Sequence, residues 1–457
     1  MNDYQQFIEA KTLIDSPTGF EPGDINPALF PWQAEIVRYA CMRGRFGGYE
    51  DCGLGKSIQQ LESARLIQEH TGRPVLILAP LAVAEQTKRE AAKFDIQAEV
   101  RVCKDQSHVG NCINVANYER LHLFEPDKFG GVLLDEGSIL KSIDGKTRGT
   151  LLNHWQCVPY RQSWSATPAP NDFMEIGNQA EFLGVMKRSE MLATFFVHDG
   201  GDTSKWRLKG HAREAFWRWM ASWCVMVRRP SDLGHNDDGY DLPPIQYHEH
   251  YTDAKAQEGQ LFAMNANTLH ERRGARKVSL QDRCEKAAEL ADGDGPCVVW
   301  CNLNSEGELL AKMIPGAVEV AGRHTIEQKE GRLAAFTNGD IRCLITKPKI
   351  GGFGLNWQHC PSTVIFPTDS WEQWYQMVRR FWRFGQTQTV NVHAVASEAE
   401  EGVIANLKRK EQDAGVMFDG IAAAMSELSR EQIKQTQRQT TTYSPTQRME
   451  LPSWLTV

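Results

Sequence analysis

The sequence predicts an α/β fold with parallel β-sheets in two domains. Several short, β-branched apolar runs are each followed by a helical pattern, which is typical of strands that helices bury on both faces. The runs fall into two groups, and the turn-rich residues 231–244 lie between them. A chain of 457 residues is also too long for a single hydrophobic core, so we expect two domains of roughly 200 residues each.

The positions of these runs set the expected domain boundaries. The predicted strands are residues 75–79, 132–136, 297–301, 341–346, 363–366 and 390–395. The expected parts are an N-terminal extension (1–28), a first domain (29–230) that ends in a helical Trp- and Arg-rich segment (about 173–230), a linker (231–244), a second domain (245–415), and a C-terminal helix with a flexible tail (416–457). From about Ser429 the chain is polar, rich in Gln and Thr and without period, which is typical of a disordered segment.

The composition is that of a soluble globular protein, with 41% hydrophobic and 24% charged residues. No apolar run approaches the ~20 residues that a membrane helix needs, and the N-terminal residues MNDYQQFIEAKTLID do not have the layout of a signal peptide. The sequence therefore predicts that the protein is not attached to a membrane. The expected location is the cytosol or nucleoid of a bacterium, which could also be an infected host cell.

The cysteines do not predict a metal site. Eleven are present without the short paired spacings of a zinc site. Cys297 and Cys301 come closest, but they flank an apolar run that is expected to be a buried strand, so we interpret them as core residues. An odd number of cysteines without an export signal indicates a reducing compartment.

Net charge and local charge point in different directions. The net charge of −7 argues against extensive coating of nucleic acid, although a local basic groove can still bind it. Residues 201–230 hold seven Lys or Arg against two acidic residues, together with four tryptophans. The apolar members follow helical spacing and are interpreted as a helix packed on its own domain: Phe216, Trp219, Met220, Trp223 and Val227. The basic members are candidates for a groove that tracks phosphates: Lys205, Arg207, Lys209, Arg213 and Arg218.

Residues 48–57, GYEDCGLGKS, end as a phosphate-binding loop. Such a loop wraps a phosphate with backbone N–H groups at a helix N-terminus, and it needs glycine where side chains would collide. Gly53 and Gly55 allow the close approach, Lys56 supplies an ammonium group, and Ser57 supplies a ligand for Mg²⁺. Glu50 stands where the usual pattern has its first glycine, so a chance match on a surface loop is the alternative at this point.

Two adjacent acids end a predicted buried strand in VLLDEGS (132–138). Asp135 is expected to hold Mg²⁺ through water, and Glu136 is expected to polarise the attacking water. The alternative is a solvated strand end without a chemical role.

Two further segments complete the candidate site. In SWSATPAPND (163–172), Ser165 and Thr167 could sense the γ-phosphate, and an ordinary Pro-rich loop is the alternative. In QMVRRFWRFGQ (376–386), Arg380 and Arg383 are one helical turn apart and are expected to face the same side. Arginines supplied across a domain cleft can stabilise the charge of phosphoryl transfer, whereas a solvated helix surface is the alternative.

In their order and spacing these elements resemble the motifs of superfamily 2 helicases, in particular the Swi/Snf-type double-stranded DNA translocases and their compact bacterial and phage relatives. The resemblance covers about residues 29–410 and includes LFPWQ (29–33) and GGFGLN (351–356). The family's phosphate loop reads Asp-Glu-x-Gly-Leu-Gly-Lys-Thr, so the missing first glycine is a family trait. By this resemblance the nucleotide-binding residues are Gln33, Gly53, Leu54, Gly55, Lys56, Ser57, Gly354 and Gln376.

The chain departs from the family pattern mildly in the phosphate loop, where the order of the acids is swapped and Ser57 replaces Thr, and more strongly at two other places. The two acids of the phosphate loop stand in the reverse order, as Glu50 and Asp51, and Arg379 stands where the family commonly has Asp before the first arginine finger. In the fifth motif the usual Ser or Thr positions read Lys347 and Pro348, with Thr346 the nearest hydroxyl.

The resemblance implies two tandem RecA-like lobes that bind ATP and Mg²⁺ in a central cleft. Lys56, Asp135, Glu136, Arg380 and Arg383 would act in catalysis, Ser57 and Asp135 would hold the metal, and Ser165 and Thr167 would couple the site to motion. The candidates for contact with nucleic acid are Lys141, Lys205, Arg207, Arg213, Thr346 and Lys347.

The function expected from these features is nucleic-acid-stimulated ATP hydrolysis that drives translocation on DNA, with duplex DNA favoured and little sequence specificity. A strand-separating DNA or RNA helicase is the alternative within the class. A binding switch that ATP gates without translocation is the alternative from another class. This interpretation leaves room for a protein partner.

Overall fold

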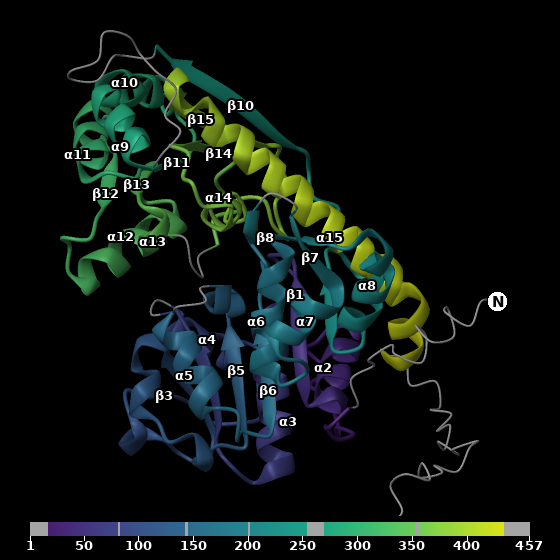
Figure 1. Cartoon of the computed structure of the whole chain (residues 1–457). Helices are drawn as coiled ribbons and strands as arrows, with labels where there is room; N and C mark the ends of the chain where they lie inside the picture. The colour runs from purple at the N-terminus through teal and green to yellow at the C-terminus, as the bar shows by residue number, and fades with distance from the viewer. Residues whose placement is uncertain are drawn as a thin grey trace, which may run out of the picture.

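The computed structural model describes residues 17–80, 83–141, 145–199, 202–253, 269–351 and 356–433. Figure 1 shows two α/β lobes, one built from the first half of the chain and the other from the second half. The seven-stranded sheet of lobe 1 and the six-stranded sheet of lobe 2 are parallel throughout. The α/β fold with two RecA-like parallel-sheet domains is therefore confirmed.

Lobe 1 contains the strand that leads into the phosphate loop. The strand order across its sheet is β3-β4-β2-β5-β6-β1-β9. The strands are β1 (Arg45–Glu50), β2 (Val75–Ala79), β3 (Val100–Val102), β4 (Ile113–Asn117), β5 (Gly131–Asp135), β6 (Tyr160–Trp164) and β9 (Cys224–Val227). The helices are α2 (Pro31–Arg43), α3 (Lys56–Thr71), α4 (Ala84–Lys93), α5 (Lys146–His154), α6 (Ile176–Leu183), α7 (Arg188–Phe195) and α8 (Arg213–Ala221).

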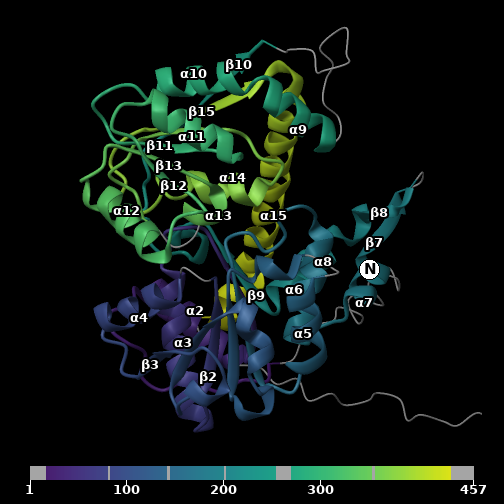
Figure 2. The same cartoon turned by 90° about the vertical axis from the view of Figure 1, so that its left-hand side faces the viewer.

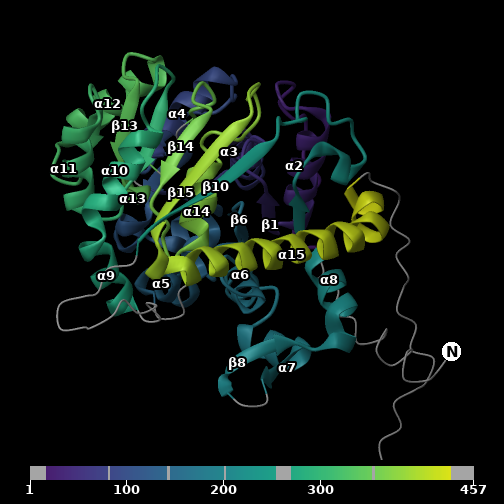
Figure 3. The same ribbon diagram turned by 90° about the horizontal axis from the view of Figure 1, so that it is seen from above.

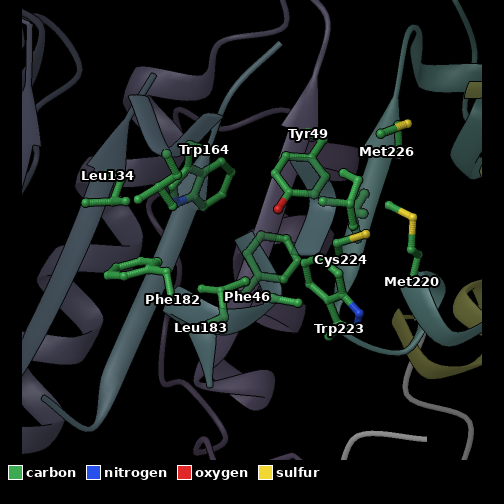
Figure 4. Close-up of a cluster of buried hydrophobic side chains, with 14 of the residues drawn as sticks. Phe46, Tyr49, Leu134, Trp164, Phe182, Leu183, Met220, Trp223, Cys224 and Met226 are labelled. Atoms are coloured by element: carbon green, nitrogen blue, oxygen red, sulfur yellow. The ribbon is translucent and has the colours of Figure 1, made fainter. Parts of the chain in front are cut away.

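Aromatic side chains from neighbouring strands fill the core of lobe 1. Figure 4 shows Phe46, Tyr49, Trp164 and Trp223 gathered beside β1, and all four are fully buried. A side chain at Gly48 would meet this core, because an added Cβ would lie 2.3 Å from the ring of Trp164. The glycines of β1 therefore let large rings from the adjacent strands pack against its backbone.

Lobe 2 has the strand order β10-β15-β14-β11-β13-β12. Its strands are β10 (Ile245–Thr252), β11 (Cys297–Trp300), β12 (Val318–Val320), β13 (Cys343–Thr346), β14 (Ser362–Ile365) and β15 (Val390–Ser397). Its helices are α9 (Leu269–Val278), α10 (Leu280–Leu290), α11 (Asn304–Met313), α12 (Ile326–Asn338), α13 (Pro348–Gly351) and α14 (Trp371–Val378). Residues 228–244 connect β9 of lobe 1 to β10 of lobe 2.

A single long helix, α15 (Glu401–Ile433), runs along both lobes (Figures 1 and 2). Val403, Ile404 and Leu407 are buried in the core of lobe 2. Farther along, Phe418 and Ile421 are buried in the core of lobe 1. The helix is continuous through residues 415 and 416, where the sequence places a domain boundary.

An antiparallel hairpin, β7 (Phe196–Asp199) and β8 (Asp202–Leu208), projects from lobe 1 (Figures 2 and 3). On the hairpin the ring of His198 lies 3.7 Å from that of Trp206. The hairpin is followed by α8, which carries three of the predicted apolar positions, Phe216, Trp219 and Met220, into the core.

The helix expected over these positions is shorter than the spacing predicts. It ends at Ala221, where the backbone N–H of Ser222 bonds to the helix end, and Val227 belongs to β9, the edge strand that pairs with β1. Trp223 and Val227 are buried as expected, but a strand rather than a helix carries Val227.

All six strands that the sequence predicts are present. Their observed ends differ from the expected ones by at most two residues: β2 matches its expected range, and β5 starts at Gly131 and ends at Asp135. The sequence does not predict β1, β3, β4, β6, β7, β8, β9, β10 or β12, and β7, β8 and β9 lie in the segment 173–230 that the sequence predicts to be helical.

Candidate functional site

The catalytic candidates of lobe 1 lie at one edge of its sheet. In a parallel sheet, ligands bind outside the carboxyl ends of the strands. The phosphate loop follows β1, Asp135 ends β5, and Ser165 follows β6, which lies between these two strands. The topology thus brings together three segments that are far apart in the sequence.

The phosphate loop has the backbone that its glycines allow. Gly53 has φ +92° and Gly55 has φ +81°, both in the left-handed region that side chains disfavour. Gly55 caps α3, so the N-terminal N–H groups of this helix face the loop. A Cβ at Gly55 would also lie 2.5 Å from Nε2 of Gln33. A Gly55 substitution would therefore cause both backbone strain and a clash.

Lys56 is held by the loop itself. Its Nζ donates to the carbonyl oxygens of Glu50 at 2.8 Å and Asp51 at 3.0 Å. These are neutral acceptors, so an anionic phosphate would be a stronger partner for the ammonium group. The lysine is thus positioned over the loop, as a phosphate site requires.

The two acids of β5 have different surroundings. Asp135 Oδ1 accepts a hydrogen bond from Gln60 Nε2 at 2.9 Å. Glu136 has φ +56°, a strained conformation for a residue with a side chain. Among the described residues, its Oε2 is buried and has no hydrogen-bond partner. The chain turns at once into Gly137, where a Cβ would lie 2.0 Å from Ser163 Oγ.

Burial disfavours the charged form of both acids. Burial raises the pKa of Asp135, and burial together with the neighbouring Asp135 carboxylate raises the pKa of Glu136 to about 7. A carboxyl group with a pKa near neutrality suits general base catalysis.

We expect kcat/KM for ATP hydrolysis to fall about tenfold per pH unit as the pH drops below 7, because a protonated Glu136 cannot accept a proton. The measurement is kcat/KM between pH 5.5 and 8.5 at saturating nucleic acid. Burial also raises the pKa of Glu50 to about 7, so Glu50→Gln is the matched control and should keep the same inflection. Loss of the inflection in Glu50→Gln would show that Glu136 is not the titrating group.

Both arginines of the predicted pair face the cleft, but no helix carries them. Helix α14 ends at Val378, and Arg380 and Arg383 lie in the tight turns that follow it. A longer helix is prevented because the carbonyl oxygen of Arg380 accepts the N–H of Trp357 at 3.0 Å. The expected helical turn is therefore wrong, although both side chains line the same cleft.

Burial in the cleft disfavours the charged form of both arginines. Burial lowers the pKa of Arg383, and burial also lowers the pKa of Arg380 to about 10. Among the described residues, Nε of Arg383 is buried and has no hydrogen-bond partner. A polyanion in the cleft would supply the missing negative charge.

One cavity joins the two lobes at this site. Its volume is about 490 Å³, within the range of small-molecule sites. Its lining includes nine of the predicted site residues: Gln33, Gly53, Gly55, Lys56, Ser57, Asp135, Glu136, Arg380 and Arg383. The structure thus brings the phosphate loop, the paired acids and both arginines around one space.

Four aromatic residues of the lining were not among the sequence candidates: Phe30, Phe94, Tyr240 and Phe384. They come from lobe 1, from the interlobe connection and from lobe 2. The rings of Tyr240 and Phe384 are 4.8 Å apart, and those of Phe30 and Tyr240 are 6.3 Å apart. Such faces suit a nucleotide base. The only available signal was the position of Phe30 and Phe384 inside the quoted motifs.

Several candidates lie beside the cleft rather than in its lining. Leu54 is buried, and its carbonyl oxygen accepts Nε2 of Gln33 at 2.8 Å. Gln376 is buried on α14. Ser165 Oγ accepts the N–H of Thr167, and both residues are buried. Gly354 lies outside the described residues.

The candidates for nucleic-acid contact lie on separate elements. Lys141 forms an ion pair with Glu372 of lobe 2. Thr346 is fully buried and donates to the carbonyl of Val320, so its hydroxyl faces the core. Lys347 donates to Asn304 Oδ1 at 2.6 Å. The remaining candidates are Lys205 and Arg207 on β8 and Arg213 at the start of α8.

The donor set at the cleft fits Mg²⁺. Ser57 and Asp135 both line it and offer oxygen ligands, which this ion prefers. Burial raises the pKa of Asp135, and a divalent cation would compensate a buried carboxylate. When bound, the metal would neutralise charge on the phosphates.

Three further observations concern metal ligands, membrane spans and cysteines. Within the described ranges, no group of three or more His, Cys, Asp or Glu residues is arranged to hold a metal ion. In the same ranges, no helix combines the length and the apolar character needed to cross a membrane. All eleven cysteines are free.

Comparison with known proteins gives structural matches only. No protein-family model and no curated protein matches the chain. The chain is similar to the Sulfolobus solfataricus SWI2/SNF2 ATPase core in complex with dsDNA, with 17% identity over 91% of this chain and 98% of that chain and a TM-score of 0.43. It is also similar to the SWI2/SNF2 ATPase core domain of the same organism, with 18% identity over 92% and 96% and a TM-score of 0.42.

Both structures are SWI2/SNF2 ATPase cores, the group that the sequence motifs resemble. At this level of identity and overlap, the roles of individual residues depend on the geometry of this chain itself.

Proposed function

We propose that this protein is a nucleic-acid-stimulated ATPase that translocates on DNA, with duplex DNA as the preferred track. The observation that carries the proposal is the single cleft lined by Lys56 and Glu136 from lobe 1 and by Arg383 from lobe 2. A phosphoryl-transfer site divided between two lobes is complete only when the lobes are correctly placed. Hydrolysis can therefore be coupled to relative motion of the lobes.

In this proposal ATP binds with its phosphates on the loop at the N-terminus of α3. Glu136 accepts a proton from the attacking water, because its Oε2 is buried without a partner among the described residues. Arg380 and Arg383 stabilise the negative charge that develops on the transferred phosphoryl group. Release of the products then allows the lobes to move apart.

A strand-separating helicase is the second candidate. The β7–β8 hairpin favours it, because a projecting antiparallel hairpin could divide two strands (Figure 3). An ATP-gated switch is disfavoured, because it does not require both a general base and a pair of arginines in the cleft.

The test is steady-state ATP hydrolysis without nucleic acid and with single-stranded DNA, duplex DNA or duplex RNA at equal nucleotide concentration. Stimulation chiefly by duplex DNA supports the proposal, and displacement of a triplex strand would then measure translocation. Stimulation chiefly by single strands favours the helicase. A high rate that no nucleic acid changes would favour the switch.

A further inference from the structure

The phosphate loop and the arginine segment contact each other through one carboxylate. Asp51 Oδ2 accepts a hydrogen bond from Arg379 Nη2 at 3.0 Å, and Asp51 Oδ1 accepts one from the hydroxyl of Tyr375. Asp51 belongs to lobe 1, whereas Arg379 and Tyr375 belong to lobe 2. The contact therefore crosses the interface between the lobes beside the nucleotide cleft.

On the lobe 1 side, Asp51 is tied to the catalytic lysine. Its backbone N–H donates to Val227 on β9 at 2.9 Å, and its carbonyl oxygen accepts Nζ of Lys56 at 3.0 Å. Its Oδ1 also accepts the backbone N–H of Cys52 at 2.6 Å. The carboxylate that reaches lobe 2 is thus fixed to the part of the loop that holds Lys56.

On the lobe 2 side, Arg379 is held by aromatic rings. Its guanidinium carbon lies 4.7 Å from the ring centre of Tyr375 and 4.2 Å from that of Trp382. Trp382 in turn donates to the carbonyl of Pro243, in the connection between the lobes, at 2.6 Å. Arg379 directly precedes Arg380, so any shift of Arg379 moves the first arginine of the cleft.

The pair is protected from solvent. The Arg379 and Asp51 side chains are only 16% and 15% exposed, so water screens their attraction less than it would at the surface. The two positions are also two of the places where the sequence departs from the family pattern, and here they contact each other. A second interlobe pair, Lys141 with Glu372, lies at the other end of α14.

We propose that Asp51, Arg379 and Tyr375 are positioning residues for hydrolysis, which set the arginine segment in register with the phosphate loop. This inference rests on the proposed ATPase function. Breaking the contact should leave the binding of ATP nearly intact, because Lys56 and the loop remain. It should lower the rate, because Arg380 and Arg383 would no longer be placed for the transition state, and displacements of about 1 Å can cost about a hundredfold.

The test is a double-mutant cycle. Asp51→Asn keeps the acceptors for Cys52 and Tyr375 but removes the charge, and Arg379→Gln removes the other charge. Each single variant should lower kcat by about tenfold or more while KM changes by less than about threefold. The double variant should lower kcat no further than either single variant does. Arg379→Lys should retain more activity than Arg379→Gln.

A binding measurement separates this inference from the proposed function. Affinity for ADP with aluminium fluoride, a transition-state analogue, should fall in Asp51→Asn and Arg379→Gln, whereas affinity for a non-hydrolysable ATP analogue should not. Arg101→Gln, which removes an exposed arginine–glutamate pair within lobe 1, is the matched control and should change neither.

The outcomes are distinct. Additive losses of kcat in the double variant, or an unchanged affinity of the single variants for ADP with aluminium fluoride, would overturn the positioning role. Nucleic-acid stimulation of the wild type would still support the proposed function in that case. The opposite result is an ATPase that no nucleic acid stimulates but whose double-mutant cycle is as expected. It would refute the proposed translocase function and leave the positioning role of Asp51 and Arg379 supported.

Discussion

Arg383→Ala should lower kcat for nucleic-acid-stimulated ATP hydrolysis by about 10³- to 10⁵-fold, with little change in the affinity for ATP. Arg383 lines the cleft from lobe 2, opposite the phosphate loop. In the proposed mechanism its guanidinium group would meet charge that grows on the phosphoryl group during transfer, and this charge is smaller in the bound substrate. The loss should therefore appear in the rate and not in binding.

The measurement combines steady-state hydrolysis with an equilibrium titration of a fluorescent ATP analogue. Arg323→Gln is a matched control from the same lobe, because Arg323 is half exposed and pairs with two acids of lobe 2, Glu308 at 3.2 Å and Glu319. It should retain wild-type turnover. Turnover of Arg383→Ala within about tenfold of wild type would contradict the assignment of this residue to the transition state.

Glu136→Gln should lower kcat by about 10²- to 10⁴-fold, the usual contribution of a general base. The substitution keeps the size of the side chain but removes the group that accepts a proton. Since Lys56 and both arginines are unchanged, ATP should bind and remain unhydrolysed on the protein. A single-turnover experiment that separates bound ATP from bound ADP measures this directly.

The matched control is Glu90→Gln, another carboxylate of the same cleft, which accepts a hydrogen bond from Gln86 at 3.0 Å. Its kcat should stay within about threefold of wild type. Equal losses in the two variants would mean that the cleft needs negative charge in general, and that Glu136 has no special role.

The parts of the site that the sequence predicts are those in which chemistry is local. The phosphate loop needs glycines at φ values that other residues disfavour, followed by a lysine and a helix, and all of these are neighbours in the chain. The paired acids are similar, because they directly follow an apolar strand. Gly53, Gly55 and Asp135 could therefore be assigned from short stretches.

The missed strands violate the apolar pattern for identifiable reasons. In β6, Arg161 is buried because its guanidinium donates to the carbonyls of Val158 and Leu183 at 2.9 Å each, so a charged residue occupies a central strand. In β1, Gly48 leaves room for the ring of Trp164. The Leu183 carbonyl is 22 residues from Arg161 and the Trp164 ring is on another strand than Gly48, so no local pattern indicates these two contacts.

The arginine segment shows the same limit. Three-residue spacing predicts a helix through Arg380 and Arg383, but the carbonyl that this helix would need is bonded to Trp357. The contact between Asp51 and Arg379 joins residues 328 positions apart. Sequence reasoning noted that both positions depart from the family pattern, but only the fold brings them together.

Helix α15 packs against both lobes and links them along one side of the molecule. The core of lobe 1 buries Met417, Phe418 and Ile421 of this helix. The core of lobe 2 buries Val403, Ile404 and Leu407. Exposing either set of side chains to water would cost about 1.5–3 kcal/mol for each side chain, so neither lobe can simply separate from α15. None of the described residues that line the cleft between the lobes belongs to α15. In the proposed mechanism the cleft would open and close while α15 stays bound to both lobes, so each hydrolysis event would rotate one lobe against the other by a limited angle.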